Sequence, residues 1–181
     1  MNVFIMKIKL FLLATLIFSV LSAYGQNTPE QNLLTQANDM GEKFIAKDYA
    51  GFLKYAHPAT VKTMGGEKKM IADTAKSFRE FEMEGVAFLD LKFGIPTKIL
   101  NVENELQCTL PEMIEMQVKG GKLTTTTTLI AISEDNGKNW YFLDTGSNDL
   151  MTMKLLLPKL SDDLVIPPPY ESIFEEDVKK E

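Results

Sequence analysis

Several residue types on which metal and catalytic sites depend are scarce in this chain of 181 residues. It contains one cysteine and one histidine, and Arg79 is its single arginine. One cysteine excludes an internal disulfide and a cysteine-rich zinc site. One histidine excludes a site with two histidine ligands, and one arginine excludes a paired guanidinium clamp on phosphate. We therefore expect no metal and no cofactor.

Basic residues are also in the minority. The formal net charge is −6, from 25 acidic and 19 basic residues. Nucleic-acid binding requires a basic face, so we expect no nucleic-acid partner. The remaining composition, 45% hydrophobic and 24% charged, is that of an ordinary globular protein with a core of its own.

The N-terminus has the pattern of an export signal. Lys7 and Lys9 precede an apolar run of 12 residues over 10–21, and small residues follow up to Gly25. Spanning a bilayer takes about 20 apolar residues, which makes an uncleaved anchor the less favoured alternative. We expect cleavage near Gly25-Gln26, a signal peptide over 1–25, and a soluble periplasmic or secreted product with no membrane span. Its net charge is then −8, since two lysines and no acid are lost.

Helices are predicted first. Apolar residues recur at intervals of three and four over 29–47, which indicates one buried helix face. Asp48 is suited to cap a short second helix, and Pro58 to begin another turn. Residues 67–84 repeat the helical period and end at Gly85.

Strands follow. Over 86–94 the apolar and polar residues alternate, with Leu89, Leu91 and Phe93 on one face. Over 105–119 the even positions are mostly apolar and the odd positions mostly polar, which is the clearest strand pattern in the chain. Pro111 within it indicates an edge position or a bulge. Further strands are expected over 123–133, where five threonines favour pleated surface, and over 139–145.

We expect the rest of the chain to form two parts. They are a single α+β domain over 26–160 and an acidic, proline-rich tail over 161–181. Residues 149–157 are expected to form one or two helical turns. We expect 161–166 to lie along the domain and the chain from Glu171 onward to be mobile.

The order of these elements is similar to that of a known superfamily. The local patterns are Lys47-Asp48-Tyr49, Met64-Gly65-Gly66, and Leu129-Ile130-Ala131-Ile132-Ser133 running on to Trp140-Tyr141-Phe142. Over about residues 31–157 the chain resembles exported bacterial members of the nuclear transport factor 2-like superfamily. That resemblance implies helices packed on a strongly curved antiparallel sheet, a cone-shaped fold with a cavity at its open end. Family members are isomerases, dehydratases, cyclases, epoxide hydrolases or non-catalytic binders, and many form dimers through the sheet.

Glu112 is the most interesting carboxylate, because strict alternation places it on the apolar face of the 105–119 strand. A carboxylate facing an apolar cavity would have a raised pKa and could act as a general acid or base. The alternative is that a bulge at Pro111 turns it into water.

Further candidate residues depend on the resemblance. Family enzymes that enolise a ketone pair an Asp base with a Tyr and a protonated acid. Asp90 and Asp144 could face the same cavity mouth, and Tyr55, Tyr141 and Glu112 are the available partners. For Asp90 the favoured interpretation is that it is one member of a polar strand face. His57 could serve dehydratase chemistry, but it lies at a helix end before Pro58, where the helix dipole favours a cation and a capping or surface role is simpler.

Three other features have structural interpretations. Cys108 lies on the apolar face of its strand, so a buried inert thiol is expected. The segment from Ser133 to Trp140 fits the Asp-box pattern, which in one copy predicts a well-formed hairpin and no glycosidase activity. Pro167-Pro168-Pro169-Tyr170 matches a WW-domain ligand, but those domains are intracellular, so we interpret the match as coincidence.

Two hypotheses from different classes follow. The first is an exported, non-catalytic module that binds a small apolar ligand or a partner, with a homodimer through the sheet. The alternative is a cofactor-independent lyase, isomerase or hydrolase that uses a carboxylate in the cavity. The sequence favours the first, because one His, one Cys and one Arg supply no convergent catalytic set.

Overall fold

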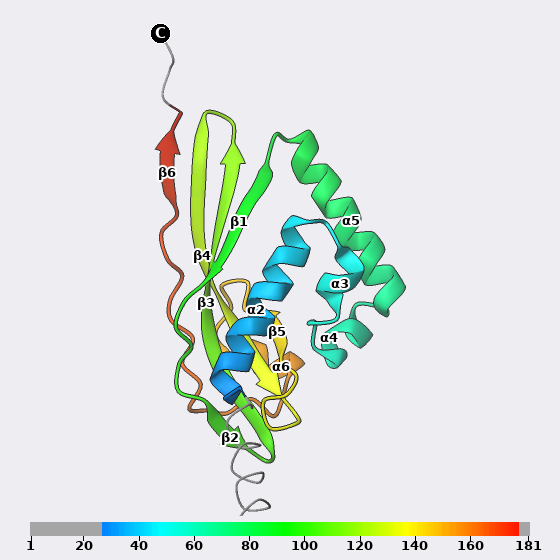
Figure 1. Cartoon of the computed structure of the whole chain (residues 1–181), viewed down its shortest axis with the longest axis vertical. Coiled ribbons are helices and arrows are strands. Elements are labelled where there is room, and N and C mark those ends of the chain that lie inside the picture. The colour runs from blue at the N-terminus through cyan, green and yellow to red at the C-terminus, as the bar shows by residue number, and fades with distance from the viewer. Residues whose placement is uncertain (1–26, 178–181) are drawn as a thin grey trace, which may run out of the picture.

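Residues 27–177 are described by the structure, a computed structural model, in which helices precede a sheet (Figure 1). The signal-peptide prediction falls on residues outside this range. The helices are α2 (Pro29–Ile45), α3 (Tyr49–Leu53), α4 (Pro58–Thr63), α5 (Glu67–Met83) and α6 (Leu150–Leu156). The predicted helical segments at 29–47, after Asp48, from Pro58, and at 67–84 are therefore confirmed.

Local capping explains where these helices begin. The Thr28 hydroxyl accepts a hydrogen bond from the Gln31 amide (3.2 Å), and the Gln31 side chain accepts one from the Thr28 amide (3.0 Å). This reciprocal capping box satisfies two of the amides that α2 leaves free at its first turn. The Asp48 carboxylate accepts from the Gly51 amide (2.9 Å) and begins α3 in the same way.

The strands within the described residues form one open antiparallel sheet of six strands, so the α+β class is confirmed. They are β1 (Ala87–Phe93), β2 (Leu100–Val102), β3 (Glu105–Val118), β4 (Gly121–Ser133), β5 (Tyr141–Asp144) and β6 (Ile173–Glu176). The long strands β3 and β4 are central. Strands β1 and β2 pair with successive parts of β3, and β5 and β6 pair with different parts of β4.

A register shift in β1 corrects one predicted face. Phe88 pairs with Met116, and Asp90 pairs with Glu115, so Leu89 is an extra residue between two paired positions. Such a bulge reverses the alternation on one side of itself. As a result Phe88 packs against Phe44 and Phe78 on the helix side, and Leu89 is 44% exposed. The prediction that Leu89 shares the face of Leu91 was therefore wrong.

Pro111 lies where the edge of β3 changes partner. Strand β1 ends at Phe93 and β2 begins at Leu100, so the intervening loop lies opposite Pro111. The Pro111 carbonyl accepts from the Gly94 amide (2.8 Å), while the missing N–H leaves no ladder bond unmade. Pairing with β4 runs through Pro111 without a shift. The predicted bulge is therefore wrong, and the predicted edge holds only locally, because β3 is a central strand that lacks a strand partner on this side at Pro111 alone and its nearest neighbours.

Each face of the sheet carries its own core. On one face α2 packs its predicted apolar stripe against the even positions of β3; the core residues here are Leu33, Ala37, Met40, Cys108, Leu110, Leu129, Ala131, Trp140 and Phe142. On the other face α6 and the chain after it cover odd positions of β3 and even positions of β4; the core residues on this face are Ile130, Ile132, Met153, Leu157, Leu160 and Leu164. Two cores allow a pocket on each side of one sheet.

The C-terminal chain is more ordered than expected. Helix α6 begins at its Asp149 cap, and the Thr109 hydroxyl donates to the Val165 carbonyl (2.9 Å), so the prediction that 161–166 lies along the domain is confirmed. Beyond the prolines, β6 pairs with residues Gly121–Thr124 of β4. The expectation of a mobile chain from Glu171 is therefore wrong for β6.

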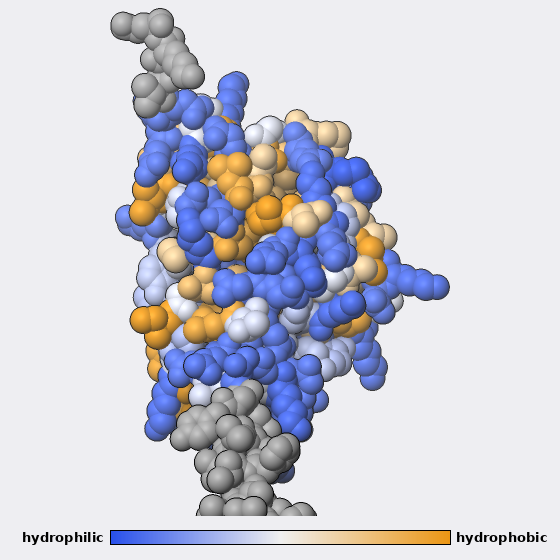
Figure 2. All heavy atoms as spheres, in the orientation of Figure 1, coloured by the Kyte–Doolittle hydropathy of each residue, from blue (hydrophilic) through white to orange (hydrophobic). Residues whose placement is uncertain are grey.

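The face seen in Figure 2 is largely hydrophilic, and its apolar side chains gather over β1 and the neighbouring ends of α2 and α5. In the part of the chain that the structure describes, no helix has the length and apolar character needed to cross a membrane.

Candidate functional site

A cavity of about 240 Å³ lies between the helices and the sheet. Its walls are apolar side chains from α2, α3, β1, β3, β4 and β5; they are Met40, Phe44, Phe52, Leu91, Ile114, Leu129 and Phe142. Two carboxylates, Glu112 and Asp144, are its acidic residues. The sequence predicted these two carboxylates as candidates.

Glu112 reaches this cavity because β3 alternates without interruption. It pairs with Thr127 directly after the Pro111–Thr128 pair, so it keeps the face of Cys108 and Leu110. Its side chain is buried, at 6% exposure, and no described residue forms a hydrogen bond or ion pair with its carboxyl group. The alternative in which a bulge turns Glu112 into water is therefore wrong.

Burial controls the protonation of Glu112. Loss of hydration, with a smaller contribution from the negative charge of Asp144, raises its pKa to about 8. The group is therefore mainly a neutral carboxylic acid at pH 7. In that form it has one O–H to donate into an otherwise apolar cavity.

Asp144 lies at the rim of the cavity, at the exposed end of β5. Its carboxylate accepts from the Thr127 hydroxyl (2.6 Å) and from the Gly146 amide (3.0 Å). Since Thr127 is also the β4 partner of Glu112, the two carboxylates belong to one small region of the sheet. One is solvated and hydrogen-bonded, and the other is buried and without a partner among the described residues.

The other predicted carboxylate and tyrosines have different surroundings. Asp90 forms an exposed ion pair with Lys92 (3.1 Å) on the polar side of β1. The Tyr55 hydroxyl donates to Asp39, and burial raises its pKa to about 12. The Tyr141 ring packs against His57, with centroids 5.7 Å apart. The structure brings Glu112 and Asp144 together and leaves these three candidates outside their cavity.

His57 caps a helix, as the simpler interpretation predicted, but it does so as a neutral group. Its Nδ1 accepts a hydrogen bond from the Ala59 amide (3.2 Å) at the first turn of α4. Burial lowers the pKa of the imidazole, against the raising effect of Glu134 and Glu105. The expectation that this position favours a cation was wrong, because His57 lies at the N-terminal end of α4, the positive end of its dipole.

Cys108 and the Asp-box have the structural roles that were predicted. The Cys108 thiol is fully buried, and burial raises its pKa to about 12, so it is not a nucleophile at neutral pH. In the hairpin, Asp135 accepts from the amides of Lys138 (3.1 Å) and Asn139 (2.8 Å), and Trp140 is 1% exposed.

Sequence reasoning missed the aliphatic part of the cavity wall. Met40, Ile114 and Leu129 come from three elements, and nothing in their local patterns separates a residue that lines a cavity from one that fills a core. Within residues 27–177, no group of three or more His, Cys, Asp or Glu side chains is arranged to hold a metal ion.

Comparison of the sequence with protein-family models and with curated proteins finds no match.

Proposed function

We propose that this chain is an exported, non-catalytic module that binds a small apolar molecule bearing one polar group. The observation that supports it is the cavity between α2 and the sheet, apolar except for the neutral acid of Glu112 and the rim carboxylate of Asp144. Small-ligand sites are typically apolar pockets with a few polar groups that set orientation.

The ligand chemistry follows from those two carboxylates. The neutral Glu112 would donate its O–H to a carbonyl, ether or hydroxyl oxygen, while Asp144 at the rim would repel an anionic group. A volume of about 240 Å³ suits a compact molecule of one or two rings. We therefore propose an uncharged ring compound with one oxygen as the ligand class.

Membership of the nuclear transport factor 2-like superfamily is part of this proposal. The order of the elements, α2 against an antiparallel sheet, and a cavity between them support it. The cone shape, the export of the chain and a homodimer through the sheet belong to the same proposal, and sedimentation of the purified protein tests the dimer.

Filling the cavity is expected to abolish binding without unfolding the protein. The probe is 1-naphthol at pH 6.5, followed by its fluorescence. Ile114→Phe places a ring in the cavity and should weaken binding at least about 10-fold, because the probe loses its apolar contacts. Met113→Phe is the matched control, since the neighbouring side chain points to the other face of β3. Equal affinity in both variants would exclude this cavity as the binding site.

The enzyme alternative is favoured by one observation, the presence of an acid of pKa about 8 and a second carboxyl group, that of Asp144, in the same cavity. Two carboxyl groups in different surroundings, one buried and one exposed at the rim, can divide acid and base roles. In a screen of small carbonyl and hydroxylated compounds, a true substrate should lose about 10²- to 10⁴-fold in kcat with Glu112→Gln while KM changes little. Turnover that survives this substitution would reject Glu112 as the catalytic acid or base.

A further inference from the structure

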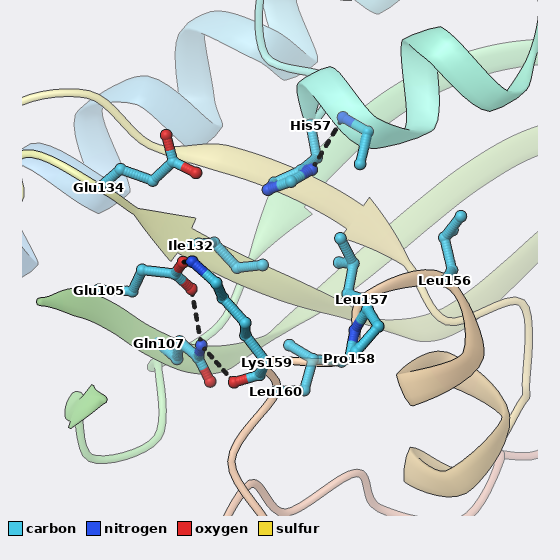
Figure 3. Close-up of a pocket in the computed structure, with 11 residues that line it drawn as sticks. His57, Glu105, Gln107, Ile132, Glu134, Leu156, Leu157, Pro158, Lys159 and Leu160 are labelled. Carbon is cyan, nitrogen blue, oxygen red and sulfur yellow. Dashed lines mark hydrogen bonds and ion pairs between the residues drawn. The ribbon is translucent and has the colours of Figure 1, made fainter. Parts of the chain in front are cut away.

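A second pocket, of about 400 Å³, lies on the opposite side of the sheet from Glu112. It is formed by the start of α4, the adjoining ends of β3 and β4, and the chain that follows α6 (Figure 3). The short contact between Ala56 and β5 fixes α4 here, because the Phe142 amide donates to the Tyr55 carbonyl (2.7 Å). This pocket contributes nothing to the function proposed above.

Its floor is a fixed polar network. Glu105 is 9% exposed and accepts hydrogen bonds from the Gln107 side chain (3.0 Å) and from the Lys159 ammonium group (3.1 Å). Gln107 is fully buried; it also donates to the Lys159 carbonyl (3.1 Å) and accepts from the Ser161 amide (2.9 Å). These bonds tie the segment after α6 to β3, so the pocket is preformed.

Two polar groups face the pocket with bonding capacity left. The Nδ1 of His57 is occupied by the Ala59 amide, so the neutral ring carries its hydrogen on Nε2. The Glu134 carboxylate is exposed at the mouth of the pocket and, within residues 27–177, takes part in no ion pair or hydrogen bond. Figure 3 shows Glu134 and Glu105 at one end of the pocket and Leu156 and Leu157 at the other.

The charged side chains that line this pocket therefore have a net negative charge. Lys159 is matched by Glu105, and Glu134 remains as a net negative charge. The other end of the pocket is apolar, with Ile132, Leu157 and Leu160 all buried. An anion would be repelled by Glu134, whereas a cation with an apolar body matches both ends.

We propose that this pocket binds a small amphipathic primary amine. Its ammonium group pairs with Glu134, and its hydrocarbon body lies against Ile132, Leu157 and Leu160. The pocket would then be a second ligand site, separated by the sheet from the cavity of Glu112 and selective for a cationic group instead of an uncharged polar one.

The single histidine of the chain makes the test direct. Protein purified without a histidine tag is titrated at pH 7.5 with octylammonium, 1-octanol or octanoate, while the NMR signal of the His57 imidazole is followed. Octylammonium should shift that signal saturably and should lower the pKa of His57, because a cation beside the ring disfavours its protonated form. Octanoate should bind at least about 10-fold more weakly.

Variants locate the ammonium group. Glu134→Gln should weaken octylammonium binding about 5-fold, the effect of losing one exposed charge pair, whereas Glu84→Gln, an exposed acid at the end of α5, should leave it unchanged. Ile114→Phe, which fills the other cavity, should also leave it unchanged. Octanoate binding as tightly as octylammonium, an affinity unaffected by Glu134→Gln, or no response of His57 to octylammonium would each overturn the proposal.

Discussion

Glu112→Gln is expected to raise the free energy of unfolding by about 4 kcal/mol at pH 8 and to flatten its dependence on pH. In the native state burial raises the pKa of Glu112 to about 8, whereas an unfolded chain has a glutamate pKa near 4.5. Between these values the unfolded state releases a proton that the native state keeps. The wild-type protein therefore loses stability as pH rises from 4.5 to 8, by roughly 5 kcal/mol at most. Glutamine is neutral throughout and avoids this loss.

Urea unfolding at pH 5, 7 and 8.5 measures the effect. At pH 5 the variant and the wild type should differ little, since both carry a neutral group in the native state. Glu115→Gln is the matched control on the same strand. Glu115 forms exposed ion pairs with Lys92 (3.0 Å) and Lys122 (3.5 Å), and hydrogen bonding to Lys92 lowers its pKa. Losing these pairs should cost less than about 1 kcal/mol. Parallel pH profiles for Glu112→Gln and wild type would show that Glu112 titrates normally.

Glu112 lowers the stability of the native protein above pH 4.5, and this cost indicates that the cavity has a function. A leucine at position 112 would satisfy the same apolar surroundings without this cost. Proteins commonly retain such a conflict between local environment and side chain at a working site. That argument supports both the ligand-binding proposal and the enzyme alternative, and the experiments with Ile114→Phe and Glu112→Gln separate them.

Local signals carried most of the fold prediction. The capping box at Thr28, the Asp48 cap and the alternation through β3 all act over a few residues, so the sequence is sufficient to read them. The same alternation placed Glu112 on the apolar face. The bulge at Leu89 could not be predicted from the sequence, because the position of an extra residue in β1 depends on the register in which β1 pairs with β3.

Long-range contacts account for the rest. Strand β6 has exposed side chains and an acidic composition, which resemble a solvated tail, yet its backbone completes the edge of β4. The second pocket joins Glu105 to Lys159 and Gln107 to Ser161, pairs separated by 54 residues. No local pattern predicts such pairs. His57 was recognisable as a capping residue, but the sign of the helix dipole beside it depended on which helix it caps.

The hairpin between β4 and β5 depends on one carboxylate. Asp135 accepts hydrogen bonds from the Lys138 and Asn139 amides, from the Asn139 side chain (2.6 Å) and from the Ser133 hydroxyl (3.0 Å). Burial alone would raise the pKa of Asp135, but the hydrogen bonds from Asn139, Ser133 and Lys138 hold it below its ordinary value. Gly137 has φ of +82° in this turn, a left-handed conformation suited to glycine, and its amide donates to the Ser133 hydroxyl (2.8 Å).

Asp135→Ala is expected to lower the free energy of unfolding by roughly 2–4 kcal/mol, since two backbone amides lose a charged acceptor at once. The hairpin also holds Trp140 in the core beneath α2, where the Gln36 side chain accepts from the Trp140 amide (2.9 Å). The loss should therefore be visible in the fluorescence of the chain's single tryptophan during urea unfolding. Because the native pKa of Asp135 is lowered, its contribution to stability is present above pH 4 and disappears as the carboxylate is protonated below that pH.

Two variants are the controls. Asp135→Asn keeps a carbonyl acceptor and should lose less stability, and Glu134→Ala beside it should change stability by less than about 0.5 kcal/mol. Equal losses in all three variants would mean that the hairpin does not depend on the Asp135 acceptor.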